Sequence, residues 1–72
     1  MNVRFAFIGF RHAHILDLLA AVRERPGLEV VACCEEDAVT REALAAKGDA
    51  QITHRNFEDV LRDVPCDVVA VG

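Results

Sequence analysis

Hydrophobic residues along the chain form two kinds of pattern, continuous runs and stripes with a helical period. Three runs are nearly uninterrupted: residues 3–9 (VRFAFIG), 28–34 (LEVVACC) and 66–72 (CDVVAVG). Runs rich in valine and of this length are typical of strands that are covered on both faces, as in a parallel sheet. A weaker run, residues 50–53 (AQIT), predicts one more short strand.

A helical stripe lies between the first two runs. Ile15, Leu18, Leu19 and Val22 recur at positions i, i+3, i+4 and i+7, which is the apolar face of an amphipathic helix. The Pro-Gly pair that follows cannot continue a helix, so we expect this one to end near Arg25.

Two further helices are marked by residues that favour helix ends. Asp37 is a good N-cap, and Gly48 can end the helix that follows it. Asn56 is an N-cap for a third helix, which closes before Pro65. The apolar face of this third helix is predicted to be Phe57, Val60, Leu61 and Val64.

These elements alternate as β-α-β-α-β-α-β with short connections. Such alternation predicts an α/β fold with a parallel sheet and right-handed crossovers. We expect the first half of a Rossmann fold, with strand order 3-2-1-4. In that order the last strand lies beside the first and leaves an apolar edge, a route to self-association that intact proteins avoid. We therefore expect residues 1–72 to be a partial nucleotide-binding domain, with a C-terminal substrate domain absent.

Composition narrows the function classes. The chain has 72 residues, 53% of them hydrophobic, and a formal charge of −4 with no basic patch, which argues against nucleic-acid binding. No apolar run reaches the roughly 18 residues of a membrane span, and the N-terminus lacks a signal-peptide pattern, so a cytoplasmic location is expected. The adjacent Cys33 and Cys34 are interpreted as buried thiols, because an odd cysteine count suits no disulfide framework.

The turn after the first strand, IGFRHAHI, carries the candidate chemistry. Gly9 stands where a dinucleotide-binding turn has its first glycine, but Arg11 and His14 occupy the second and third glycine positions. No proline interrupts residues 10–14, so the helix start offers free N–H donors and a positive dipole end. Arg11 blocks close backbone approach, yet its guanidinium can bind a phosphate itself.

An acidic marker follows the second strand. Glu35 comes 26 residues after Gly9 (35 − 9), where such folds place a carboxylate that binds ribose hydroxyls. Strand alternation favours Glu35 over Glu36 and Asp37 as the residue that points inward. A carboxylate there repels a 2′-phosphate, so NAD is expected as cofactor in preference to NADP. The predicted cofactor-binding residues are Gly9, Phe10, Arg11, His12, Ala13 and Glu35.

Each of these features has a simpler interpretation. A glycine after a strand can be only a turn, and the acidic run can be a solvated helix start. His12 and His14 are two positions apart and share no helix face, so we expect no metal site. His54 is interpreted as a solvated loop residue.

Taken together, the segments FAFIGF, LEVVACCEED and ITHRNFEDVLRDVPCDVVAVG resemble the N-terminal domain of the glucose–fructose oxidoreductase/inositol dehydrogenase (Gfo/Idh/MocA) family. The resemblance covers nearly the whole chain. It implies an NAD(P)-dependent oxidoreductase that acts on a sugar, polyol or similar alcohol, with Glu35 as the ribose-binding acid. Two of the three motif glycines are absent, and the resemblance places the catalytic residues beyond Gly72. The alternative is a non-catalytic Rossmann-like binding module or an inert truncated fragment.

Overall fold

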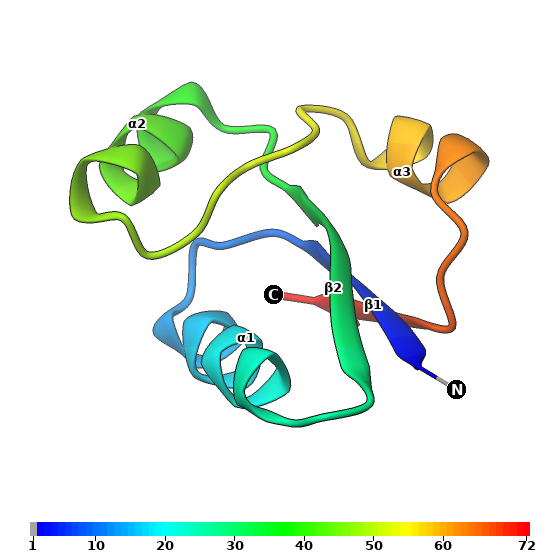
Figure 1. The fold of residues 1–72 in the computed structure, drawn as a ribbon. Helices are drawn as coiled ribbons and strands as arrows, with labels where there is room; N and C mark the ends of the chain where they lie inside the picture. Colours follow the sequence, from blue (N-terminus) through cyan, green and yellow to red (C-terminus); the bar gives the residue numbers. More distant parts are fainter. Residues whose placement is uncertain (1) are drawn as a thin grey trace.

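The structure is a computed structural model and describes residues 2–72. In this part of the chain, three parallel strands form one sheet of order β2-β1-β3, and three helices connect them (Figure 1). The elements are β1 (Val3–Ile8), α1 (Ala13–Glu24), β2 (Leu28–Cys34), α2 (Ala38–Lys47), α3 (Phe57–Asp63) and β3 (Val68–Val71). The predicted α/β class and parallel sheet are therefore confirmed.

The predicted fourth strand at residues 50–53 is wrong. This segment runs beside the end of β2 but makes only one isolated bridge, between Cys34 and His54. The Cys33 N–H donates to the hydroxyl of Thr53 at 3.0 Å and not to a backbone carbonyl, so a side chain interrupts the ladder. The full order 3-2-1-4 is consequently not formed, although the other three strands have the neighbours that it requires.

The register brings the carboxyl ends of all three strands to one edge of the sheet. Ile8 lies opposite Cys34 in β2 and opposite Val71 in β3. The turns after β1 and β2 therefore leave the sheet side by side. This is the edge at which parallel sheets commonly bind ligands.

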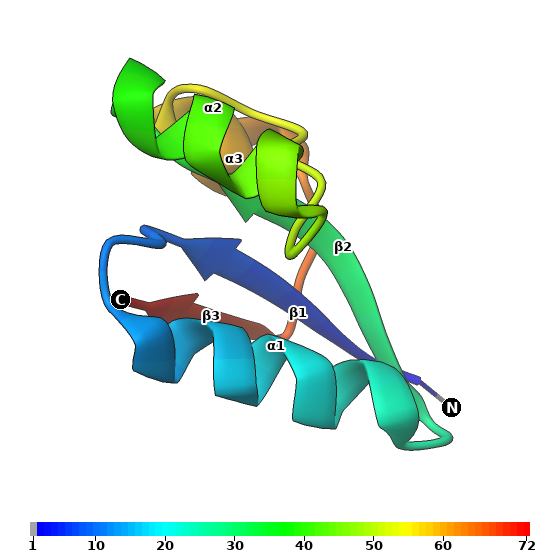
Figure 2. The same cartoon turned by 90° about the vertical axis from the view of Figure 1, so that its left-hand side faces the viewer.

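The two faces of the sheet are covered by different helices. On one face Phe7 and Cys33 pack with Ile15, Leu19 and other buried residues of α1, and on the other Val60 of α3 packs against alanines and Cys34. Figure 2 shows α1 along one side of the sheet and α3 on the other. The adjacent buried residues of β1 face opposite sides, as a strand covered on both faces requires.

The helix ends form where the sequence places them. Asp37 caps α2 through its carboxylate, which accepts the Thr40 N–H at 2.9 Å, and Gly48 ends α2 in the left-handed region at φ +71°. Hydrogen bonds from the Thr40 hydroxyl and N–H lower the pKa of Asp37. Asn56 caps α3 by accepting the N–H of Glu58.

Burial departs from the predicted helix stripes at a few positions. Leu18 was expected in the buried face of α1 but is 44% exposed, whereas Leu16 packs against the core. On α3 only Val60 is fully buried, while Phe57 and Leu61 are largely exposed. The buried stripe of α1 is therefore shifted around the helix from Leu18 toward Leu16, and α3 buries a narrower stripe than the sequence pattern predicts.

Other sequence predictions concern the cysteines and the last strand. Cys33 and Cys34 are free, buried thiols, as expected, and burial raises the pKa of both. Val69 and Val71 of β3 are exposed, so the predicted apolar edge is present. Among residues 2–72, no helix combines the length and apolar character that crossing a bilayer requires.

Candidate functional site

Gly9 forms the tight turn that the sequence predicts at the end of β1. Its φ of +87° lies in the region that favours glycine, and a Cβ there would stand 2.9 Å from the carbonyl oxygen of Gly72. A side chain at position 9 would therefore clash with the backbone that follows β3. Gly72 in turn donates its N–H to the Ile8 carbonyl at 2.9 Å, so a hydrogen bond joins the residue after β3 to the end of β1.

The start of α1 offers unpartnered backbone donors. His12 is the N-cap in an extended conformation and makes no side-chain capping bond, and the first turn of α1 carries no acidic residue. Within residues 2–72, no hydrogen bond is formed by the N–H groups of Arg11, His12, Ala13 or His14. These four residues are exposed, so the helix start, with its unpartnered donors and the positive end of the helix dipole, lies at the surface.

Phe10 behaves differently from its neighbours. Its ring is 4% exposed and packs in the core beside Phe7. Its N–H is already donated to a carboxylate oxygen of Glu35 at 2.7 Å. Of the predicted cofactor-binding residues, Phe10 therefore presents neither its ring nor its N–H to solvent.

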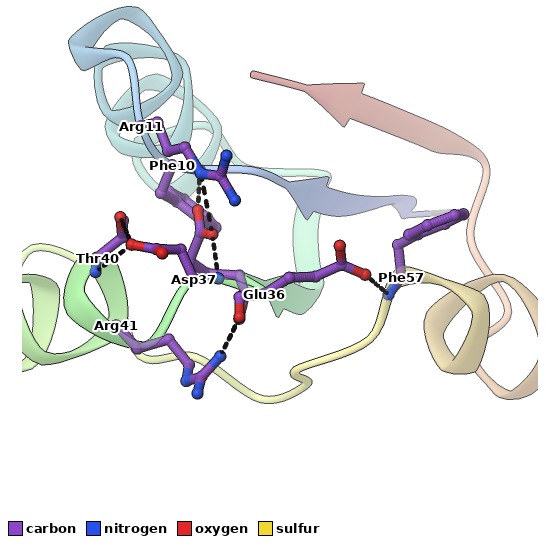
Figure 3. A network of polar contacts seen from close by, with 8 residues as sticks. Phe10, Arg11, Glu36, Asp37, Thr40, Arg41 and Phe57 are labelled. Atoms are coloured by element: carbon purple, nitrogen blue, oxygen red, sulfur yellow. Dashed lines mark hydrogen bonds and ion pairs between the residues drawn. The ribbon is translucent and has the colours of Figure 1, made fainter.

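Glu35 points inward, as strand alternation predicts, but it is almost completely buried at 2% exposure. One carboxylate oxygen accepts the Phe10 N–H, and the other accepts the Asp37 N–H at 2.8 Å. In Figure 3, Phe10 and Asp37 are labelled, and dashed lines mark contacts that join the turn after β1 to the segment before α2. Glu35 thus ties the turn after β1 to the turn after β2.

Arg11 lies above this buried carboxylate. Its Nε atom is 3.6 Å from the Glu35 carboxylate, and its side chain is 64% exposed. The separation is longer than a hydrogen bond, so Arg11 keeps its donors available while it partly offsets the charge of Glu35. A phosphate at the mouth of α1 would meet both the guanidinium and the free N–H groups.

The next acid, Glu36, is exposed, and its carboxylate accepts the N–H of Phe57 at 3.3 Å. Its backbone carbonyl accepts a hydrogen bond from Arg41 at 2.7 Å, so the residue is held from both sides. Strand alternation predicts that Glu35, and not Glu36, points inward. The signal for Glu36 is its position two residues past the end of β2, where side chains leave the sheet for solvent.

A cleft of about 180 Å³ lies at the carboxyl ends of the strands. Its lining joins residues from both turns with the ends of β1 and β3 and the start of α3. The lining residues are Ile8, Gly9, Arg11, Cys34, Glu35, Glu36, Phe57, Val71 and Gly72. Of the predicted residues, the structure brings Gly9, Arg11 and Glu35 to this cleft, while His12 and Ala13 lie at the neighbouring helix start.

A larger hollow of about 640 Å³ lies elsewhere, between α2 and residues 48–55. It is a surface groove, and Gly9, Arg11 and Glu35 are not among the residues that line it. The smaller cleft is the candidate ligand site, because ligands of parallel sheets bind at the carboxyl ends of the strands. Sequence reasoning missed Phe57 and Gly72 as cleft residues, although both sit where chain segments reach this edge.

The histidines do not gather into a metal site in the described part of the chain, where no group of three or more potential ligands occurs. The imidazole Nδ1 of His54 lies 2.7 Å from the Thr53 hydroxyl. Comparisons of this chain with protein-family models, with curated proteins and with solved structures found no match.

Proposed function

We propose that the start of α1 binds the diphosphate of an NAD-type dinucleotide. The observation that carries this proposal is the set of four consecutive unpartnered N–H groups at residues 11–14. They lie at the positive end of a 12-residue helix and beside the carboxyl edge of a parallel sheet. Backbone donors of this kind match the oxygens of a diphosphate.

The charges around the cleft favour NAD over NADP. Arg11 supplies a cation for the diphosphate, whereas the acidic residues after β2 suit the hydroxyls of a ribose. A 2′-phosphate beside these carboxylates would be repelled. The resemblance to Gfo/Idh/MocA proteins implies a nicotinamide dinucleotide, either NAD or NADP, and the preference for NAD comes from these carboxylates alone.

With that resemblance, we infer that the chain is the nucleotide-binding part of an NAD(P)-dependent oxidoreductase acting on a sugar, polyol or similar alcohol. A bound nicotinamide supplies hydride transfer. Residues 2–72 would bind and orient the dinucleotide, and we assign no catalytic residue among them.

The test removes one N–H donor without disturbing the helix. Ala13 is the first residue of α1, where proline is tolerated, and the extended conformation of His12 (φ −111°, ψ 139°) suits a residue before proline. We expect Ala13→Pro to weaken NADH binding by about tenfold or more, since a hydrogen bond to a charged group contributes about 1.5–3 kcal/mol. Binding is measured by calorimetric titration of NADH into the full 72-residue chain.

Ala38→Pro is the matched control, because Ala38 is the first residue of α2 and follows a residue of similar conformation (φ −81°, ψ 122°). This variant should bind NADH as the wild type does. Absence of NADH binding by the folded wild-type chain, or equal affinity of Ala13→Pro and wild type, would contradict the proposal.

A second candidate is a non-catalytic Rossmann-like module that binds another nucleotide or anion. The observation in its favour is that Arg11 stands where a glycine would admit the diphosphate to the backbone, while Glu35 already holds the Phe10 N–H. Arg11→Gly separates the two candidates. Affinity for NADH that appears only in this variant would support the non-catalytic module.

A further inference from the structure

The outer edge of β3 combines open backbone groups with apolar side chains. Within residues 2–72, β3 pairs only with β1, and the Gly72 N–H donates to the Ile8 carbonyl at 2.9 Å. Because backbone N–H groups alternate in direction along a strand, Val69 and Val71 direct their N–H and C=O groups to the other side. Among the same residues, eight large hydrophobic side chains are exposed, and three of them, Val68, Val69 and Val71, belong to this four-residue strand. The exposed apolar surface is therefore concentrated at this edge.

β3 carries none of the features that keep exposed strands apart. Natural proteins protect such edges with charged side chains, prolines or β-bulges. The sequence of β3, VVAV, contains neither a charge nor a proline, and its register with β1 is regular. β2, at the opposite edge of the sheet, has the exposed Glu29 and a bulge at Val31, which has no partner in β1. Of the two edge strands, β3 is therefore the one suited to pairing with a further strand.

The charges beside β3 suit a second copy of the chain that runs antiparallel. Asp67 immediately precedes β3, and its carboxylate accepts hydrogen bonds from the N–H of Arg4 at 2.9 Å and from its Nε at 3.3 Å. The two residues therefore neutralise each other, although the whole chain has a formal charge of −4. An antiparallel partner places its own Arg4 and Asp67 at the far end of the joined strands. Like charges are thus not brought together, and the uncharged strands face one another.

We propose that a second copy of this chain pairs antiparallel with β3 about a twofold axis at Ala70. In this register Val69 of one copy lies opposite Val71 of the other, and the two residues exchange backbone hydrogen bonds through the groups that each leaves open. The valine side chains then meet on one face of the joined sheet, a cross-strand contact that β-branched residues favour. An axis at Val69 would place Asp67 opposite a valine of the second copy, so the charge pattern selects the axis at Ala70.

The experiment measures the mass of the full 72-residue chain by sedimentation equilibrium, with interference optics because the chain has no Trp or Tyr. We expect a monomer–dimer equilibrium. Val71→Lys should weaken dimerisation about tenfold or more, since each dimer loses two valine contacts and gains two like charges. Val39→Lys is the matched control, because this valine of α2 is 74% exposed, as Val71 is. It should dimerise as the wild type does, and circular dichroism should show both variants folded.

Amide hydrogen exchange of the wild type locates the contact without a substitution. The N–H groups of Val69 and Val71 should exchange more slowly as the protein concentration rises. The Gly9 N–H, which donates to the Cys34 carbonyl within one chain, is the reference. A chain that stays monomeric at about 1 mM would overturn the proposal and leave the edge to a different strand. Equal dimerisation of Val71→Lys and wild type, or exchange at Val69 and Val71 that does not depend on concentration, would place the contact elsewhere and overturn it as well.

Discussion

The Glu35→Gln substitution exchanges a buried carboxylate for a side chain of nearly the same size with a single acceptor oxygen. In the wild type, each carboxylate oxygen accepts one backbone N–H, from Phe10 at 2.7 Å and from Asp37 at 2.8 Å. In the variant, the amide oxygen can accept one of these N–H groups, and the amide NH₂ must face the other. One buried donor therefore loses its partner, and the surviving bond loses its charge.

The free-energy cost follows from these two bonds. A hydrogen bond to a charged group contributes about 1.5–3 kcal/mol, and an unsatisfied buried donor costs about 1–3 kcal/mol. The Arg11 ion pair adds little, because its guanidinium is largely exposed. We expect Glu35→Gln to lower the free energy of unfolding by about 2–4 kcal/mol. At about 0.05–0.15 kcal/mol per residue, a chain of this size has only about 4–11 kcal/mol in total.

The assay is urea denaturation at neutral pH, followed by far-ultraviolet circular dichroism. Glu36→Gln is the control next to it in the sequence, and because Glu36 is exposed its stability should lie within about 0.5 kcal/mol of wild type. The reasoning is refuted when Glu35→Gln also falls within that range with an unchanged denaturant slope. That result would mean that the two N–H groups find other partners at no cost.

Three further substitutions test other parts of the fold. Gly9→Ala should lower the melting temperature more than Gly27→Ala does. Both glycines have φ near +87°, where a side chain costs about 1–2 kcal/mol of strain, but only at Gly9 would the new methyl group also contact backbone atoms. Equal melting temperatures of the two variants would refute this. Val60→Ala should destabilise by about 2–3 kcal/mol in urea because Val60 is fully buried, whereas Leu61→Ala, at a position 57% exposed, should stay within about 0.5 kcal/mol. The folded-state pKa of Asp37 lies below its ordinary value of 3.8, so Asp37 contributes stability above about pH 4 that is lost as the pH falls through the folded pKa. Asp37→Asn, which keeps the cap, should therefore show a shallower loss of stability on acidification, and identical pH profiles would contradict this assignment.

Local signals in the sequence predicted the helices well. The caps at Asp37, Gly48 and Asn56 were confirmed because capping depends on residues within a few positions of one another. The missing strand at residues 50–53 depends on a partner about 20 positions away. There the Thr53 hydroxyl occupies the Cys33 N–H, and no pattern within AQIT could reveal that.

For the candidate site, too, the sequence predicted the local features but not the long-range contacts. Alternation along β2 correctly indicated that Glu35 points inward, and the absence of proline indicated free donors at the start of α1. The sequence could not show that the Phe10 N–H, 25 positions away, donates to one oxygen of that carboxylate. This long-range bond joins the turn after β1 to the turn after β2.

The two borders of the sheet are unequal in their capacity to recruit another strand. The far side of β2 is shielded at its carboxyl end by Thr53 and His54, which bond to Cys33, whereas the far side of β3 has no such shield within residues 2–72. Within the part of the chain that the structure describes, one border is therefore fully open to strand addition. Two copies that join antiparallel through β3 use up the open border of each, so such assembly stops at a closed twofold pair and does not propagate into a fibre.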